Sequence, residues 1–185
     1  MSVYISLLHY PVYDKNGRVV STAVTNLDIH DIARMSKTFG LAGYFLVTPV
    51  DDQREMVQRI LQHWLAGPGR DYNPVRREAF HTVKVVPDLA SVVGEIERLE
   101  GKRPYTVGTS AREGDSRLSF AELRRRIENS DSDPILLVLG TGWGLEQSFI
   151  ESLDTILEPI RGRGEFNHLS VRSAAAIMVD RLLGR

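Results

Sequence analysis

The sequence contains no cysteine. The protein therefore cannot form a disulfide, use a thiol as a nucleophile or bind a metal through thiolates. No apolar run approaches the roughly 18 residues of a transmembrane helix. The apolar part of the N-terminus is short and has no positive charge before it, so we do not expect a signal peptide. These absences favour a protein that works in the cytoplasm.

Common catalytic and metal-binding patterns are also missing. His9, His63 and His81 show no metal-ligand spacing, and we predict no metal site. No Gly-x-Ser-x-Gly motif is present, so a serine hydrolase has no support. The net charge of −1 is far from the positive charge typical of a nonspecific nucleic-acid binder. Lysine and arginine do gather between residues 101 and 126, which fits either a local phosphate contact or a solvated helix face.

What the sequence does contain is enough apolar material for a core. Hydrophobic residues make up 42% of the 185 residues, which favours one domain over residues 1–185. Apolar periodicity and β-branched runs predict strands at 3–10, 44–48, 79–87, 105–108, 135–139 and 155–157. They predict helices at 28–39, 51–65, 88–100, 120–128, shortly after 147 and from 171 onward, with a loop at 67–74. Because strands alternate with helices, the expected fold class is α/β with a mostly parallel sheet flanked by helices.

Three of the predicted strands are followed by glycine-bearing segments, at 107–110, 139–144 and 159–164. In parallel α/β folds, ligands bind outside the carboxyl ends of the strands. Glycine there allows the backbone to approach a ligand closely. We therefore expect the three segments to form one pocket.

The segment Gly-Thr-Gly-Trp-Gly at 140–144 fits a dinucleotide-binding fingerprint poorly. That motif follows the first strand of its unit, has its third glycine one place later, and precedes an acidic residue about 20 positions on. A phosphate-binding P-loop fails because no Gly-Lys-Ser/Thr follows. A nucleotide-dependent oxidoreductase is therefore a minor alternative.

Three segments in this order carry a resemblance to a known superfamily. They are AVTNLDIHDIARMSKTFGL (23–41), ILLVLGTGWGLE (135–146) and FNHLSVRSAAAIMVDRLLG (166–184). Together they resemble the motifs of the SPOUT superfamily of α/β-knot, S-adenosylmethionine-dependent RNA methyltransferases, nearest to the bacterial domains related to tRNA (guanine-N1) methyltransferases. In that comparison Arg34 and Gly40 match the first motif.

The same comparison shows two departures from the family pattern. Asp28 replaces an asparagine of the first motif. Asn167 or His168 stands for the asparagine of the last motif.

The resemblance implies a C-terminal trefoil knot, S-adenosylmethionine as cofactor, an RNA substrate (tRNA or rRNA) and a homodimer whose active sites form across the subunit interface. The alternative within the same fold is a non-catalytic α/β-knot module that binds RNA or cofactor. The implied cofactor-binding residues are Thr106, Gly108, Thr109, Ser110, Leu139, Gly140, Thr141, Gly142, Trp143, Gly144, Ile160, Gly162, Asn167, His168, Leu169 and Ser170.

The catalytic candidates lie near the expected start of the helix at 28–39. Methyl transfer requires an acceptor that loses a proton and a group that steadies developing charge. Arg34 can orient an RNA phosphate or stabilise an oxyanion, and His30, one turn away, can act as base with help from Asp28 or Asp31. Asn26 can orient a base edge or a ribose.

Structural roles remain open for the same residues and two others. Asp28 can be only the N-cap of its helix, His30 only a surface histidine, and Arg34 only part of an exposed face. Trp143 can belong to the core. Arg172, early in the last helix, can pair with a carboxylate instead of contacting RNA.

Overall fold

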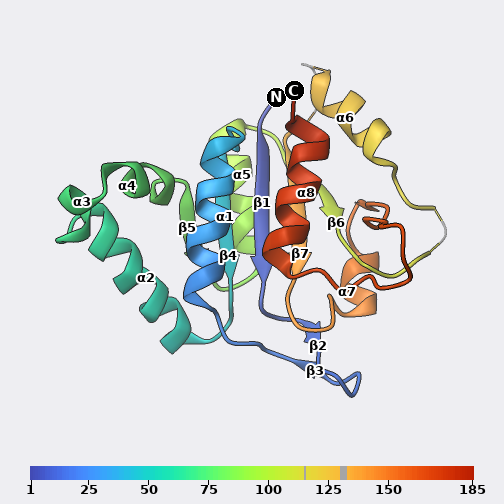
Figure 1. Cartoon of the computed structure of the whole chain (residues 1–185), viewed down its shortest axis with the longest axis horizontal. Coiled ribbons are helices and arrows are strands. Elements are labelled where there is room, and N and C mark those ends of the chain that lie inside the picture. Colours follow the sequence, from blue (N-terminus) through green and yellow to red (C-terminus); the bar gives the residue numbers. More distant parts are fainter. Residues whose placement is uncertain (115, 130–132) are drawn as a thin grey trace.

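A six-stranded parallel sheet forms the centre of the molecule (Figure 1). The computed structural model describes residues 1–114, 116–129 and 133–185. The strands lie in the order β5 (Val83–Val86), β4 (Gly43–Val47), β1 (Val3–Leu8), β7 (Ile135–Gly140), β6 (Tyr105–Gly108) and β8 (Thr155–Ile156), each parallel to its neighbours. The predicted α/β class with a mostly parallel sheet is confirmed.

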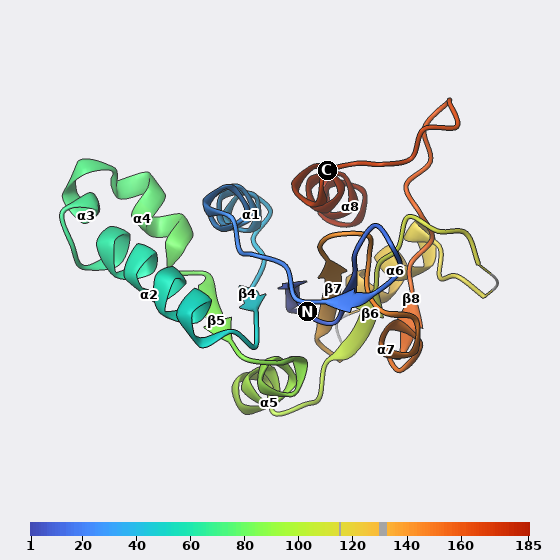
Figure 2. The same ribbon diagram turned by 90° about the horizontal axis from the view of Figure 1, so that it is seen from below.

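Helices cover both faces of the sheet, which is why its central strands are apolar along their length. Every residue of β1 is buried, and alternate residues join different cores. Ile5 packs with α1 (Asn26–Thr38) and α8 (Val171–Leu183), whereas Tyr4 packs with α5 (Leu89–Glu100). Figure 2 shows α1 and α8 on one side of the sheet and α5 on the other.

Three helices extend beyond the β5 edge of the sheet (Figures 1 and 2). They are α2 (Asp51–Leu65), α3 (Gly69–Tyr72) and α4 (Pro74–Phe80). The predicted loop at 67–74 is wrong in part, because α3 lies within it. The predicted strand at 79–87 begins too early. Asn73 caps α4 and Pro74 is its first residue. The helix that starts there continues to Phe80, so β5 begins later than predicted.

Helix caps fix the starts of two helices near the carboxyl ends of the strands. Thr25, not Asp28, is the N-cap of α1: its hydroxyl oxygen accepts a hydrogen bond from the Asp28 amide. The N-cap interpretation of Asp28 is therefore wrong. A capping box starts α6 (Phe120–Glu128), with Ser119 as cap and Glu122 as its partner.

Smaller elements lie at the carboxyl-terminal edge of the sheet (Figure 1). A hairpin of β2 (Val12–Tyr13) and β3 (Val19–Val20) follows β1, with Gly17 at φ 75° in its turn. The short helix α7 (Gln147–Glu151) follows β7. In the described part of the chain, no helix is long and apolar enough to cross a membrane.

Candidate functional site

A cleft of about 940 Å³ opens where the sheet's strands end. Its walls come from the segment 22–28 at the start of α1, residues 109–114 and Arg117 after β6, the segment 139–151 around the end of β7, and residues between 156 and 178 from β8 into α8. These segments are far apart in the sequence, and parallel strand ends bring them together.

Most of the cofactor-binding residues expected from the sequence line this cleft, together with one of the catalytic candidates. They are Asp28, Thr109, Ser110, Leu139, Gly140, Thr141, Gly142, Trp143, Gly144, Ile160, Asn167, His168, Leu169 and Ser170. The three glycine-bearing segments thus contribute to one cleft.

Three expected cofactor residues lie outside it. Thr106 is buried in β6, and its hydroxyl donates to Asp154 Oδ2 at 2.7 Å. Gly108 faces α7, where a Cβ would lie 2.8 Å from Ile150 Cγ1. Gly162 is exposed, and a Cβ there would meet nothing within 4 Å. Of these, Gly108 contacts a residue of the cleft lining, Ile150.

The catalytic candidates divide between two sites. Asn26 and His30 line a separate groove of about 610 Å³ between α1 and α2. Arg34 is exposed two turns beyond Asn26 and lines neither the cleft nor the groove. Only Asp28, on another side of α1, is buried against the cleft.

His30 is half-buried among aromatic rings. Its ring centroid lies 4.7 Å from that of Phe80 and 5.7 Å from that of Trp64. Burial lowers the pKa of His30, and the nearby Arg76 lowers it further, while Asp31 opposes the shift. Of the two carboxylates expected to support His30, Asp31 is the one whose charge acts on it. A neutral imidazole follows from these contacts.

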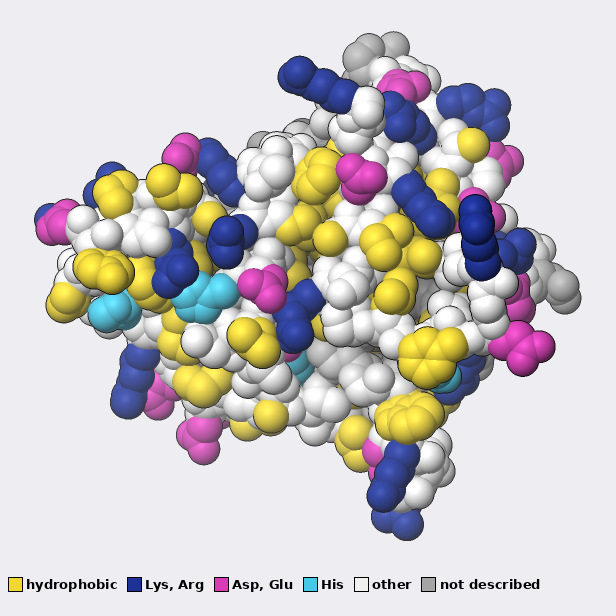
Figure 3. All heavy atoms as spheres, in the orientation of Figure 1, with side chains coloured by type: hydrophobic (Ala, Val, Ile, Leu, Met, Phe, Trp, Pro, Cys, Tyr) yellow, Lys and Arg dark blue, Asp and Glu magenta, His cyan; other side chains and the backbone are white. Residues whose placement is uncertain are grey.

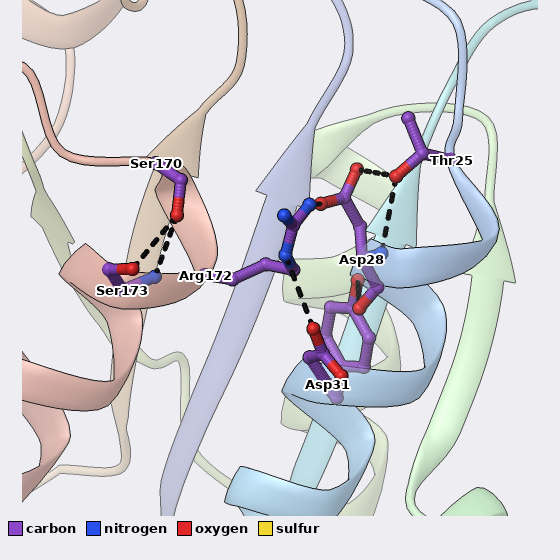
Figure 4. Close-up of polar contacts among 7 residues, drawn as sticks. Thr25, Asp28, Asp31, Ser170, Arg172 and Ser173 are labelled. Atoms are coloured by element: carbon purple, nitrogen blue, oxygen red, sulfur yellow. Dashed lines mark hydrogen bonds and ion pairs between the residues drawn. The ribbon is translucent and has the colours of Figure 1, made fainter.

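Asp28 forms a buried ion pair with Arg172, which joins α1 to α8 (Figure 4). Arg172 Nη1 lies 3.0 Å from Asp28 Oδ1, and its Nε lies 3.2 Å from Asp31 Oδ2. The other Asp28 oxygen accepts from the Thr25 hydroxyl at 2.6 Å. Only 6% of the Asp28 side chain is exposed. The interpretation that Arg172 pairs with a carboxylate is confirmed.

A chain of hydrogen bonds connects His9, at the end of β1, to the cleft wall. The Thr141 hydroxyl donates its one hydrogen to the Leu8 carbonyl at 3.2 Å. In the 2.5 Å contact between the Thr141 and Thr22 hydroxyls, Thr141 is therefore the acceptor and Thr22 the donor. The Thr22 oxygen then accepts from His9 Nδ1 at 3.0 Å. This leaves His9 Nε2 unprotonated, and it has no hydrogen-bond partner among the described residues. Burial accordingly lowers the pKa of His9 to about 4.

We expect this histidine to make the protein less stable in acid. In the unfolded chain, the pKa of His9 is near 6.5, so the unfolded state binds a proton at His9 below that pH. The folded state does not bind this proton until the pH falls to about 4. The free energy of unfolding should therefore fall by about 2 kcal/mol between pH 7.5 and pH 5 on account of His9 alone. Urea unfolding at several pH values measures the slope.

The matched variant for that slope is His9→Asn, which keeps an amide near the position of Nδ1 but cannot titrate. In this variant the free energy of unfolding should no longer depend on the protonation of residue 9, whereas the pH dependence caused by His30 should remain. Equal slopes in the two proteins would show that His9 does not stay neutral in the folded state.

The loop after β7 is held against the β2–β3 hairpin. The Trp143 amide donates to the Tyr13 carbonyl and the Tyr13 amide donates to the Gly144 carbonyl, both at 2.9 Å. Gly142 has φ 59°, and a Cβ there would lie 2.8 Å from the Tyr13 carbonyl oxygen. Glycine is thus required both by the backbone conformation and by the close approach. Trp143 is 58% exposed, so the core interpretation is wrong.

The segment before α8 crosses the loop after β6. The Asn167 side-chain amide donates to the Ala111 carbonyl at 3.0 Å, and Arg161 pairs with Glu113 at 2.9 Å. Ser170 then caps α8. The polar residues before α8 therefore serve both to start the helix and to close one wall of the cleft.

Arg117 is the most informative cleft residue that sequence reasoning missed. Its Nε and Nη1 are buried and have no hydrogen-bond partner in the described part of the chain, and Nη2 has only a 3.4 Å contact with the Arg112 carbonyl. A guanidinium with free donors beside a cleft is suited to an anionic group of a ligand. The only signal in the sequence was its place shortly after the glycine-bearing segment that ends at Ser110.

Comparison with known proteins agrees with this architecture. A family model described as SAM-dependent RNA methyltransferase matches residues 2–184. A tRNA (guanine-N(1)-)-methyltransferase from Oleidesulfovibrio alaskensis is 46% identical over 183 residues, which cover 99% of this chain. The chain spans only 42% of the length of that relative.

Two solved structures share the fold. A methylase family protein from Neisseria gonorrhoeae superposes with a TM-score of 0.65 at 14% identity, covering 100% of this chain and 82% of the other. The SpoU methyltransferase AviRb from Streptomyces viridochromogenes, in complex with AdoMet, superposes with a TM-score of 0.53 at 19% identity, covering 99% and 56%. At these identities the likeness concerns the fold alone.

Proposed function

The chain belongs to the SAM-dependent RNA methyltransferase family, and from that membership we propose that it transfers a methyl group from S-adenosylmethionine to a nucleotide of RNA in the cytoplasm. The observation that carries the proposal is the single cleft formed by the three glycine-bearing segments at the carboxyl ends of β6, β7 and β8. The name of the 46% identical relative makes a guanine of tRNA the first substrate to test, with rRNA second.

The residues of the cleft fit S-adenosylmethionine. Its volume is within the range of cofactor pockets. The donors of Arg117 that have no partner among the described residues suit the carboxylate of the cofactor's amino-acid end. Backbone groups at 139–144 and the side chains of Leu139, Ile160 and Leu169 would hold the adenine. When bound, the cofactor supplies a methyl group on a sulfonium, and the chain's own residues position the acceptor.

We propose further that the active protein is a homodimer. Asn26, His30 and Arg34 share a face of α1 that is turned away from the cleft of their own chain. Arg34 is exposed and forms no ion pair among the described residues, and the neighbouring Leu27 is 57% exposed. A second copy packed on this face would bring Arg34 near that copy's cleft. There its guanidinium would hold an RNA phosphate or a developing negative charge.

A trefoil knot at the C-terminus is part of the proposal, within one domain of residues 1–185. Its support is the crossing of the segment 157–170 with residues 109–114, made by the contacts of Asn167 with Ala111 and of Arg161 with Glu113. A knotted crossing would hold the two cleft walls together without a disulfide.

The direct test is titration of the protein with S-adenosylhomocysteine and, separately, NAD in a calorimeter. We expect binding of the first and none of the second. Gly142→Ala should weaken binding of S-adenosylhomocysteine by about tenfold or more, because both the positive φ and the Tyr13 carbonyl oppose a Cβ. Gly162→Ala is the matched control and should leave the affinity unchanged, since its Cβ would point into open space.

Transfer of a labelled methyl group to tRNA and rRNA then distinguishes an enzyme from a non-catalytic module that only binds RNA or cofactor. NAD binding without binding of S-adenosylhomocysteine would overturn the proposed function. Tight cofactor binding with no transfer to either RNA pool would favour the non-catalytic alternative.

A further inference from the structure

Three aromatic side chains form an exposed patch at the mouth of the cleft. We call Trp143, Phe166 and His168 the rim patch. Trp143 is 58% exposed, Phe166 is 82% exposed, and His168 is also exposed. On the face shown in Figure 3, hydrophobic side chains and a histidine gather at the lower right, close to lysine and arginine side chains. Large aromatic side chains left in water at one place indicate a binding surface.

The rings of the rim patch contact each other in T-shaped pairs. The ring centroids of Trp143 and His168 are 6.4 Å apart with planes at 64°, and those of Phe166 and His168 are 5.3 Å apart at 71°. In such a T-shaped pair the edge of one ring meets the face of the other, so each contact covers at most one face of a ring. Since Trp143 is 58% exposed and Phe166 is 82% exposed, much of each ring remains accessible to a flat partner.

The rim patch continues outward from the cofactor cleft. Trp143 and His168 line the cleft, whereas Phe166 lies beyond its lining. A group that stacks on the outer part of the patch would sit next to the cleft without occupying it. This is the position expected for an acceptor base or its neighbour in the chain.

A positive charge accompanies the rim patch. The Arg112 guanidinium lies 5.5 Å from the centre of the Tyr13 ring. The Tyr13 carbonyl accepts a hydrogen bond from the Trp143 amide. The residue before Arg112, Ala111, accepts the hydrogen bond from Asn167, which lies between Phe166 and His168 in the sequence. Arg112 makes no ion pair with any described residue, so its charge is available to a phosphate.

We propose that the rim patch stacks an unpaired nucleobase of the substrate RNA, with Arg112 contacting the adjacent phosphate. This inference rests on the proposed function and adds how the same site receives its substrate. Exposed aromatic faces beside a cation are the common means of binding single-stranded nucleic acid. The Arg112 guanidinium, which forms no ion pair with a described residue, favours a phosphate-bearing strand over a second protein chain.

Tryptophan fluorescence can report on the patch directly, because the sequence has only two tryptophans, Trp64 and Trp143. In a Trp64→Phe background, a short single-stranded oligoadenylate should quench the emission of Trp143, and the same strand paired with oligouridylate should quench it far less. If neither RNA changes the emission of Trp143, the proposal is overturned.

Affinity for the single strand, measured by filter binding in the otherwise unaltered protein, makes the test independent of Trp64. Phe166→Ala should weaken binding about tenfold, the loss of one base stack. Tyr72→Ala is the matched control: Tyr72 is 84% exposed on α3, far from the cleft lining, and should have no effect. Equal effects of the two variants would overturn the proposal.

Two further measurements separate the possible failures. Affinity for S-adenosylhomocysteine should be unchanged in Phe166→Ala, because Phe166 lies outside the cofactor cleft. If the protein binds no S-adenosylhomocysteine but still binds RNA through Phe166, the proposed function fails and this inference stands. If Phe166→Ala instead shifts the mass measured in ultracentrifugation from dimer to monomer, the patch is a contact between copies and the inference fails.

Discussion

Replacing Arg172 with alanine is expected to lower the free energy of unfolding by about 3 kcal/mol. The change removes the only cation that pairs with the Asp28 carboxylate among the described residues, and that carboxylate is 6% exposed. An uncompensated buried charge is among the most destabilising features a substitution can create. The Thr25 hydroxyl would still donate to Asp28, but one neutral hydrogen bond does not replace a cation.

Urea unfolding of both proteins at neutral pH measures this effect. The matched control is Asp31→Ala, which removes the exposed arm of the same network; its side chain is 50% exposed, and it should cost less than about 1 kcal/mol. Asp28→Asn combined with Arg172→Ala should be less destabilised than the sum of the single changes, because neither charge is then left alone. Strict additivity would show that the two side chains do not interact.

Replacing Arg34 with alanine is expected to lower the rate of methyl transfer by about 100-fold, with affinity for S-adenosylhomocysteine unchanged within a few-fold. Arg34 does not line the cleft of its own chain, so its loss should not disturb the cofactor. If it steadies charge in the transition state, the loss falls on the rate. Lys37→Ala is the control: Lys37 is another exposed cation of α1, already paired with Glu78 at 2.9 Å.

Mixing two impaired variants decides whether Arg34 acts across a dimer. A dimer of one Arg34→Ala chain and one Gly142→Ala chain has one intact cleft, which would face the intact Arg34 of the other copy. Under the proposed arrangement, mixing should restore part of the activity. No recovery from a mixture that forms such dimers would place Arg34 within its own chain's site. A collapse of cofactor affinity in Arg34→Ala would mean that its role has been misassigned.

Sequence reasoning located most elements of the fold because their signals are local. The strands β1 and β7 are continuous apolar runs, and the capping box at Ser119 marks the start of α6. It was less accurate around residue 80. There Asn73 and Pro74 start a helix that ends at Phe80, and the β-favouring residues of β5 follow almost at once. A short apolar run of this kind does not by itself distinguish a helix from a strand.

The cleft could be predicted in outline for a similar reason. Glycine after a strand is a local feature, and the parallel topology guarantees that such segments lie at one edge of the sheet. The direction of a side chain on α1 is different, because it depends on what packs beside it. Asn26, His30 and Arg34 share a face, and that face is turned toward α2 and solvent, whereas Asp28 is turned toward α8.

The sequence by itself thus determined the α/β class, the strand-end cleft and the family, since each depends on local periodicity, glycine placement or ordered motifs. Only the tertiary structure decided the partners of individual charges. Arg172 and Asp28 are separated by 144 residues in the sequence, and nothing local joins them. The same holds for the rim patch, whose rings come from two loops after different strands. Contacts between distant segments follow from how helices and strands pack, and that packing is a property of the whole chain.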